Sequence, residues 1–532
     1  MYTALNCKTH YSIRQSIMRP DQLKGRTDLV NVCMADNGHV CGAVQWKKSL
    51  PNGLIGISVT TIIDEKMILI AKNKKGWKNI LKISSIINTK DNKGKIRKQD
   101  LIDLLNDDLI VIYMYPENKP VPNSWYGIDI NNDDHQLVRE TADRKNLKSV
   151  MAHEAWYVNS VDKIDMAIVL SISYNKPVNI ILREFLNKKR HILSYTEAIE
   201  SGYTDAEIKN TNIISDICSS FTPLSNPVLP KFECPDELQS SEYLQILCEQ
   251  KSPDSEIYRT RLHEELKIIE KYQLQDYFLI VRDIINYTNS KHGYSGIRGS
   301  GVGSIISYLS GISQVDPIKY NLVFERFLNE GRFSGGHIQL PDIDIDVPAE
   351  ARADVINYVK EKYGHDRVGQ ILTYQRIKAA AAVKAVFKAN TSLDYQEINH
   401  ISSILPQESK IVDKIKEENL DSVIEWALIH NSGNFKQWGY IEDGEIKGEY
   451  KQCFEQAIRL EGINSARSRH AAGIIVSPEP LINICPLIYD ENSKTEICGM
   501  EMNDLEALGC LKLDILGLRL FDKMLEFYHD VC

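Results

Sequence analysis

Residues 340–350 read LPDIDIDVPAE, and this stretch decides how the central part of the chain folds. Aspartates alternate in it with isoleucines. In a β-strand, residues i, i+2 and i+4 point to the same face of the sheet. The stretch therefore predicts a strand that buries its two isoleucines and presents Asp342, Asp344 and Asp346 together on the other face.

Three neighbouring carboxylates indicate a cation, because like charges this close repel one another unless a positive charge lies between them. Oxygen ligands with no His or Cys nearby favour Mg²⁺ over Zn²⁺. A calcium loop also spaces its acids alternately, but it needs a glycine after the third acid, and Val347 and Pro348 follow here. A solvated edge strand with outward charges stays open as the alternative for this segment alone.

A glycine-rich stretch, GIRGSGVGSIISYLSG, precedes the aspartates at residues 296–311. We expect a helix to begin at about Ser304, where backbone N–H groups would bind an anion. No Gly-Lys-Ser/Thr follows, so the stretch is not a P-loop. It predicts either phosphate binding or a flexible turn, and beside a magnesium strand it suggests two-metal nucleotidyl transfer. The residues that would approach or contact the ligand are Arg298, Gly299, Ser300, Gly301, Gly303 and Ser304.

Residues 367–393 carry several basic side chains and no acid. In a helix, Arg376, Lys384 and Lys388 would share one broad face, with Lys378 in the same segment. Such a face would contact a triphosphate or a DNA backbone. A solvated face is the alternative.

Length and composition limit the classes of protein to which this chain can belong. A chain of 532 residues is long enough for roughly three to four domains. It has no run of about 18 apolar residues, and its N-terminus lacks the pattern of a signal peptide. Eleven cysteines without a CxxC pair favour free thiols in a reducing cytoplasm. A net charge of −9 argues against a protein that coats nucleic acid but allows a local basic groove.

Several long motifs together resemble the palm of the bacterial C-family replicases, the DNA polymerase III alpha subunits. The glycine-rich stretch continues through SQVDPIKYNLVFERFLNEGRF to PDIDID. Three further stretches agree in order and spacing, namely YVKEKYGHDRVGQILTY, SRHAAGIIVSPEPL and DLEALGCLKLDILGLRL. The resemblance covers residues 231–532 and extends more weakly to the N-terminus.

The resemblance implies roles for individual residues. Asp344, Asp346 and Asp514 correspond to the three catalytic aspartates, which hold two Mg²⁺ ions, and Asp342 supports them. One ion would activate the primer 3′-hydroxyl, and the other would bind the triphosphate for in-line attack. The residues implied at the incoming nucleotide are Arg298, Gly299, Ser300 and Lys512. Further DNA or triphosphate contacts are expected from Arg376, Lys378, Lys384, Lys388 and His470.

The N-terminal part resembles the family's PHP domain, whose metal ligands are mainly histidines. Asn6 and Lys8 occupy the positions of its opening His-x-His pair, Asn37 replaces the His after Asp36, and Trp156 stands where another His would be. We therefore expect a scaffold without a metal-dependent nuclease site. The histidines that lie near the pattern but off it are His10, His39 and His153.

The implied fold is a multidomain α/β chain. A PHP-like domain (1–225) precedes a palm of the polymerase-beta type in two parts (226–388 and 459–532), with a mostly helical, thumb-like insertion between them (389–458). Family members continue for several hundred residues past the third aspartate, through fingers and a clamp-binding region. Only a short segment follows here, so we expect a split or truncated product that needs a separate C-terminal chain.

The leading hypothesis is a DNA-directed DNA polymerase, the catalytic half of a replicase. It would act in the cytoplasm on primer–template DNA and dNTPs, and would reach a sliding clamp and other replisome proteins through the C-terminal chain. The alternative is a non-catalytic binding or assembly protein derived from such a polymerase. A PHP-type phosphoesterase is a third reading, which the lost histidines disfavour.

Overall fold

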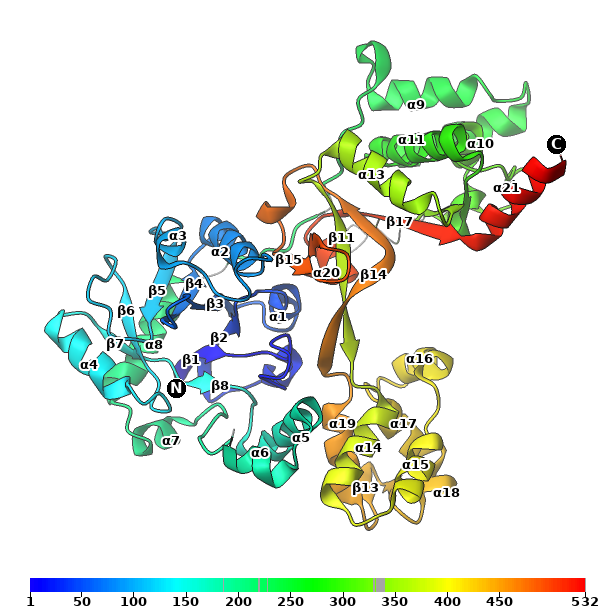
Figure 1. Cartoon of the computed structure of the whole chain (residues 1–532). Coiled ribbons are helices and arrows are strands. Elements are labelled where there is room, and N and C mark those ends of the chain that lie inside the picture. The colour runs from blue at the N-terminus through cyan, green and yellow to red at the C-terminus, as the bar shows by residue number, and fades with distance from the viewer. Residues whose placement is uncertain (185, 219–220, 227, 329–330, 332–339, 532) are drawn as a thin grey trace. The chain divides into compact units, whose positions relative to one another are not determined.

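The computed structural model describes residues 1–184, 186–218, 221–226, 228–328, 331 and 340–531 (Figure 1). The chain forms two compact units, each built from segments that are distant in sequence. The first unit comprises residues 1–87, 92–222 and 374–468. The second comprises residues 88–91, 223–373 and 469–532. Each unit contains both helices and strands, so the expectation of a multidomain α/β chain is confirmed.

The first unit is built on an eight-stranded sheet with the order β7-β6-β5-β4-β3-β2-β1-β8. Runs such as LIVIY in β5 are buried along their whole length, as expected of strands that are covered on both faces. The strands are β1 (Tyr2–Cys7), β2 (Leu29–Asn37), β3 (Leu54–Thr60), β4 (Lys66–Ala71), β5 (Leu109–Tyr113), β6 (Trp125–Ile128), β7 (Ser149–Met151) and β8 (Glu154–Ala155). The accompanying helices are α1 (Ala43–Ser49), α2 (Lys74–Ile87), α3 (Lys98–Ile102), α4 (His135–Arg144), α5 (Lys163–Tyr174), α6 (Val178–Glu184), α7 (Tyr195–Glu200) and α8 (Asp205–Ile217).

A helical part of the first unit shares a core with α5. Phe387 and Phe454 pack in the same apolar cluster as Met166, and Arg459 Nε lies 2.6 Å from Asp165 Oδ2. The helices of this part are α14 (Ala379–Asn390), α15 (Tyr395–Ser403), α16 (Glu408–Glu417), α17 (Val423–His430), α18 (Ser432–Phe435) and α19 (Lys451–Leu460). A small hairpin, β12 (Tyr440–Glu442) and β13 (Glu445–Lys447), precedes α19.

The second unit is built on a seven-stranded sheet with the order β15-β16-β11-β14-β17-β10-β9, although residues 374–376 of β11 and 464–468 of β14 belong to the first unit. The strands are β9 (Gly296–Arg298), β10 (Asp344–Pro348), β11 (Val368–Arg376), β14 (Asn464–Val476), β15 (Leu487–Asp490), β16 (Thr495–Cys498) and β17 (Leu511–Leu518). The helices are α9 (Ser240–Glu249), α10 (Glu256–Lys271), α11 (Gln275–His292), α12 (Ile305–Leu309), α13 (Arg352–Tyr363), α20 (Met502–Ala507) and α21 (Arg519–Val531).

The aspartate stretch lies in the core of the second unit. Ile343 and Ile345 are buried in one apolar cluster with residues of α11 and α13, as the alternating pattern predicts. The Ile343 N–H donates a hydrogen bond to Tyr277 Oη at 2.9 Å. The strand itself begins at Asp344, so the exposed Asp342 precedes it.

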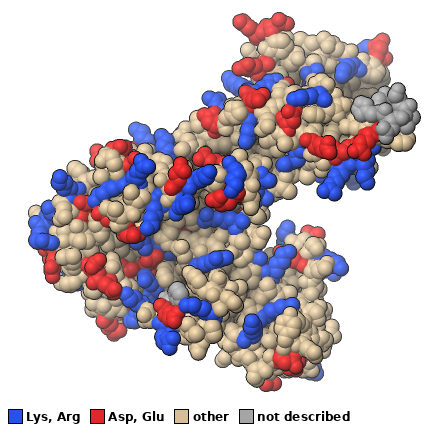
Figure 2. All heavy atoms as spheres, viewed as in Figure 1, with Lys and Arg blue, Asp and Glu red and all other residues tan. Residues whose placement is uncertain are grey.

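The distribution of charged side chains and the state of the cysteines agree with what the composition indicated. Figure 2 shows Lys and Arg side chains interspersed with Asp and Glu over the visible face. The cysteines among the described residues are free thiols, and nearly all of them are buried. In the described part of the chain, no helix has the length and apolar character needed to cross a membrane.

Candidate active site

Four neighbouring strands of the second unit place one residue each in a single row across the sheet. Asp344 on β10 lies opposite Asp514 on β17, a parallel partner. Arg298 on β9 lies opposite Asp344, and Gly473 on β14 lies opposite Asp514, both in antiparallel pairs. Because side chains alternate along a strand, Asp346 shares the face of Asp344. The sheet therefore brings together all three aspartates that the sequence singled out.

Arg298 partly neutralises the β10 aspartates. Its Nε lies 3.8 Å from Asp344 Oδ2 and 3.5 Å from Asp346 Oδ1. Burial raises the pKa of Asp344, and the nearby Asp514 raises it further, while Arg298 opposes the shift. Burial likewise raises the pKa of Asp346 against the effect of Arg298. In both residues burial is the main cause of the raised pKa, and the neighbouring carboxylates add to it.

Lys512 neutralises the aspartate on β17. Its Nζ lies 3.0 Å from Asp514 Oδ2 and 3.6 Å from Asp342 Oδ1. Burial by itself would lower the pKa of Lys512, but the hydrogen bond to Asp514 and the charge of Asp342 outweigh it and raise the pKa. Lys512 therefore stays positively charged within the site, and its ammonium group is suited to contact a phosphate oxygen.

The donor set of the three aspartates suits Mg²⁺. Asp346 Oδ1 and Asp514 Oδ1 are buried without a hydrogen-bond partner, which leaves acceptor capacity that a cation would use. Carboxylate oxygens are also the ligands that Mg²⁺ prefers. Among the described residues, no group of three or more His, Cys, Asp or Glu is arranged to hold a metal ion.

The glycine-rich turn lies beside the aspartates. Gly299 has a φ of +79°, a conformation that favours glycine, and a Cβ at this position would lie 3.9 Å from Asp344 Oδ2. A 3-10 turn spans Gly299–Gly303 and includes Ser300. At Gly303, an added Cβ would lie 2.9 Å from the Val323 carbonyl oxygen. The turn thus passes close to Asp344, as the sequence suggested. The stretch SQVDPIKYNLVFERFLNEGRF follows the turn, and part of its C-terminal end lies outside the described residues.

The helix after the turn does not offer the anion site that we expected at its N-terminus. α12 begins at Ile305, and the buried side chain of Glu265 already occupies this end. Glu265 accepts hydrogen bonds from Ser304 Oγ at 2.7 Å and from the Ile305 N–H at 3.1 Å. The expectation is therefore wrong at this position, because a carboxylate from α10 satisfies the N–H groups that a phosphate would need.

Glu265 is a structural residue of the site that sequence reasoning missed. Arg261 Nε lies 2.7 Å from Glu265 Oε1, and Arg261 Nη2 donates to the carbonyl oxygens of Gly303 (3.2 Å) and Leu322 (3.4 Å). Burial raises the pKa of Glu265, and its hydrogen bonds with Arg261 and Ser304 oppose that shift. A signal was present, because Glu265 stands at helical spacing on the face of α10 that buries Leu262.

His470 lies in the same neighbourhood as Asp514. Its Nδ1 accepts hydrogen bonds from the N–H groups of Gly473 at 2.8 Å and Ala472 at 3.3 Å. A Cβ at Gly473 would lie 3.0 Å from this nitrogen and 3.3 Å from Asp514 Oδ1. Gly473 therefore gives the Asp514 carboxylate its room, a role that a residue without a side chain does not reveal in the sequence.

The basic segment does not form one helical face. β11 continues through Arg376, and α14 begins only at Ala379, so Arg376 and Lys378 precede the helix that carries Lys384 and Lys388. The prediction that Arg376, Lys384 and Lys388 share one helical face is therefore wrong. The run VGQILTYQ is rich in β-branched and aromatic residues that favour a strand, and it pairs within the sheet. All four basic side chains are exposed and belong to the first unit.

The N-terminal residues singled out earlier are engaged in hydrogen bonds within the first unit. The Asp36 carboxylate accepts from Thr9 N at 2.7 Å, from Thr9 Oγ1 at 2.6 Å and from Ser12 Oγ at 2.6 Å. Burial raises the pKa of Asp36, and these hydrogen bonds oppose the shift. His10 Nδ1 accepts from the Asn464 N–H at 3.4 Å. His39 is buried, and His153 Nε2 lies 3.0 Å from the His191 carbonyl oxygen.

Comparison with known proteins assigns the family. The family described as "Bacterial DNA polymerase III alpha NTPase domain" matches residues 236–517. A DNA polymerase III subunit alpha from Aquifex aeolicus is 28% identical over 97% of this chain and 51% of its own length. One from Staphylococcus epidermidis is 30% identical over 85% of this chain and 40% of its own, and one from Borreliella burgdorferi is 29% identical over 93% and 46%.

All of these matches are to alpha subunits of bacterial DNA polymerase III, which defines the class of protein that the chain resembles. The chain belongs to the bacterial DNA polymerase III alpha family, as the sequence motifs indicated. It spans about half the length of the curated relatives it matches.

Proposed function

We propose that this chain carries the nucleotidyl-transfer site of a DNA-directed DNA polymerase that acts in DNA replication. The observation that carries the proposal is the register of β10 and β17, which sets Asp344 beside Asp514 with Asp346 on the same face. In this proposal the sheet of the second unit is the palm, residues 1–225 form the PHP-like domain, and α14–α19 form the thumb-like part. The substrates are primer–template DNA and dNTPs.

Asp344, Asp346 and Asp514 would hold two Mg²⁺ ions. Bound Mg²⁺ in such a site lowers the charge on the triphosphate and favours attack by the primer 3′-hydroxyl. The chain's own contribution is to fix the three carboxylates on one rigid sheet. Asp346 Oδ1 and Asp514 Oδ1 are buried without a hydrogen-bond partner, so both oxygens retain acceptor capacity for a metal ion.

Arg298, Gly299, Ser300 and Lys512 would bind the incoming triphosphate. Arg298 and Lys512 pair with the aspartates in the described structure. Arg298 and Lys512 would balance the charge of the aspartates before nucleotide binds and would contact the phosphate oxygens of the bound triphosphate. The left-handed Gly299 keeps the backbone close to Asp344 without a side chain in the way.

Enclosure of the templating base pair would come from further polymerase sequence, in the same polypeptide or in a separate chain, which would also carry contacts to a sliding clamp. The apolar side chains of α21 offer a surface for it. Leu520, Met524 and Phe527 are exposed, and their spacing places them on one face of the helix. An exposed apolar stripe of this kind favours association.

A second candidate, a non-catalytic polymerase-derived assembly protein, is favoured by one observation. The chain's own Arg298 and Lys512 pair with the aspartates, so part of the carboxylate charge is balanced from within the chain. Nucleotide binding separates the two candidates.

The test is Mg²⁺-dependent binding of a fluorescent dNTP to the 532-residue chain. We expect weak binding that Asp344→Asn and Asp514→Asn reduce at least about tenfold, because each change removes a ligand charge from the metals. Asp254→Asn is the matched control, since Asp254 is exposed in the same unit and pairs with Arg259 rather than with a residue of the site. Binding that is absent, or that is equal in all of these proteins, favours the non-catalytic candidate.

A further inference from the structure

Lys8 is a fully buried lysine at the end of β1 in the first unit. Its Nζ donates a hydrogen bond to Asn6 Oδ1 at 2.9 Å and another to the Ala35 carbonyl oxygen, and it lies 3.9 Å from Glu154 Oε1. An ammonium away from water is costly unless acceptors and a counter-charge surround it. Three oxygens from three different strands provide both here.

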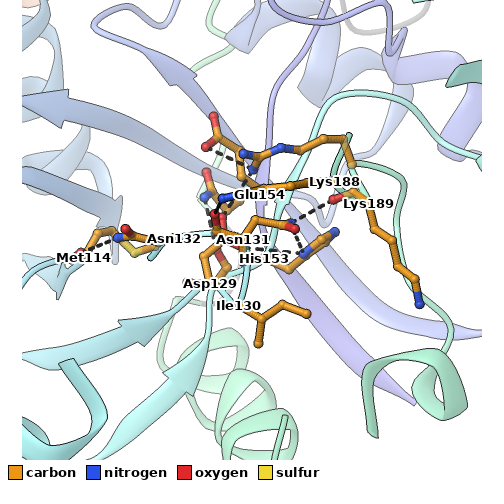
Figure 3. Close-up of polar contacts among 12 residues, drawn as sticks. Met114, Asp129, Ile130, Asn131, Asn132, His153, Glu154, Lys188 and Lys189 are labelled. Carbon is orange, nitrogen blue, oxygen red and sulfur yellow. Dashed lines mark hydrogen bonds and ion pairs between the residues drawn. The ribbon is translucent and has the colours of Figure 1, made fainter. Parts of the chain in front are cut away.

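The Glu154 carboxylate is the centre of a larger ion network. Its Oε2 lies 2.9 Å from Lys66 Nζ and 3.6 Å from Arg190 Nη1. Arg190 Nη1 also lies 3.3 Å from Asp129 Oδ2. Figure 3 shows Asp129, which follows β6, close to His153 and to Glu154 on β8. Burial would raise the pKa of Glu154, but Lys66, Lys8 and Arg190 outweigh it and lower the pKa.

Two neighbouring residues orient the cations of this network. Asn6 Nδ2 donates to the Ala152 carbonyl oxygen at 3.2 Å, which directs Asn6 Oδ1 toward Lys8. The Trp156 ring lies 4.7 Å from the Arg190 guanidinium carbon, within reach of a cation–π contact. Positions 6, 8 and 156 are those at which the resemblance implies histidine ligands. In this chain the Asn6 amide and the Trp156 indole contact cations, and the Lys8 ammonium is itself a cation.

The residues present therefore do not fit a metal cluster. Ammonium and indole groups have no lone pair to offer a metal ion, and an amide nitrogen is not a ligand in place of imidazole. The acidic groups are already neutralised from within the chain. Burial lowers the pKa of Lys8, and the Glu154 carboxylate opposes that shift, so the pair depends on mutual contact.

We propose that Lys8 is a built-in cation that takes the place of a metal ion, and that with Lys66 and Arg190 it holds the edge formed by β1, β2 and β8 together around Glu154. The first unit then owes its stability at this edge to an internal ion network and binds no divalent metal there. The inference concerns only the first unit and is independent of the proposed function.

A double-mutant cycle on the full chain tests the pairing. Lys8→Met removes the charge at similar volume, and we expect it to lower the unfolding midpoint by roughly 10 °C, because a buried carboxylate loses a partner. Glu154→Gln also destabilises, and the double variant K8M/E154Q is more stable than the sum of the two effects predicts. Lys95→Met is the control, since Lys95 pairs with Asp64 in the same unit and does not contact the Glu154 network. The metal prediction is checked with ⁵⁵Mn²⁺ or Zn²⁺ content in a background with Asp344→Asn and Asp514→Asn, so that the proposed polymerase site does not contribute.

The outcomes separate clearly. Additive effects of K8M and E154Q, or a K8M effect no larger than that of K95M, overturn the proposal. So does stoichiometric metal that is lost on Asp36→Asn. If K8M fails to fold, recovery of folding in K8M/E154Q supports the pairing. If K8M and K8M/E154Q both fail to fold while E154Q folds, the proposed pairing of Lys8 with Glu154 is contradicted.

Discussion

Asp344 and Asp514 are direct partners in the parallel pair β10 and β17, although the helical part α14–α19 lies between them in the sequence. After β10 the chain passes through α13 and β11 into this helical part and returns through β14, whose Gly473 is the other partner of Asp514. The row from Arg298 to Gly473 is therefore assembled from four separate segments. Its geometry depends on sheet pairing rather than on any loop.

Gly473 offers a way to disturb this row without touching a charge. Gly473→Ala would place a Cβ 2.7 Å from Ile371 Cδ1 and 3.3 Å from Asp514 Oδ1. We expect a loss of about 1–3 kcal/mol in the free energy of unfolding, because an added methyl overpacks the strand pair. Gly296→Ala in β9 is the matched control, since its Cβ would meet only Tyr294 Oη at 3.7 Å. Equal stability of both variants in denaturant unfolding would show that the row tolerates a side chain here.

Glu265 is expected to position the glycine-rich turn. Glu265→Gln keeps an acceptor for Ser304 Oγ but loses the ion pair with Arg261. We predict dNTP binding weakened by about tenfold and a smaller change in thermal stability, because the turn loses its anchor while the core stays packed. Asp283→Asn is the control, as Asp283 pairs with Lys362 in the same unit. If the two variants weaken nucleotide binding equally, Glu265 has only a general structural role.

Glu154 predicts how acid affects the first unit. The neighbouring cations hold its pKa below the ordinary value of 4.5, so the unfolded chain takes up this proton at a higher pH than the folded chain does. The stabilisation is fully present above the ordinary pKa and is lost as the pH falls below it. Thermal unfolding from about pH 7 to about pH 4 should therefore show the gap between wild type and Glu154→Gln narrowing as the pH falls. Glu184→Gln, at an exposed carboxylate, serves as the control; a gap of constant size for E154Q would refute the linkage.

Part of this site was predictable from sequence alone. The alternation around Ile343 and Ile345 correctly predicted a buried strand face, since side-chain direction in a strand is a local property. The partner of Asp344 was inferable only from resemblance, because strand pairing across the sheet leaves no local signal. The filled helix end at Glu265 was missed for the same reason, as its contacts with Ser304 and Ile305 join distant segments.

The strand through Arg376 shows a different limit. Spacing alone permitted a helical face, and the β-branched and aromatic run before it carried the stronger signal. Helical periodicity of charges was therefore a weaker guide than the propensity of the apolar residues beside them.

Template-directed primer extension tests the central claim most directly. The 532-residue chain is combined with a polypeptide that supplies the remaining polymerase sequence of the family, and single-dNTP incorporation is measured in Mg²⁺. The account predicts incorporation that falls by at least about 100-fold in Asp344→Asn, Asp346→Asn and Asp514→Asn, since each removes a metal ligand. It predicts little change in Asp254→Asn, whose exposed side chain pairs with Arg259 rather than with a residue of the site. Undiminished incorporation by any one of the first three variants would contradict the assignment of these aspartates as the nucleotidyl-transfer site.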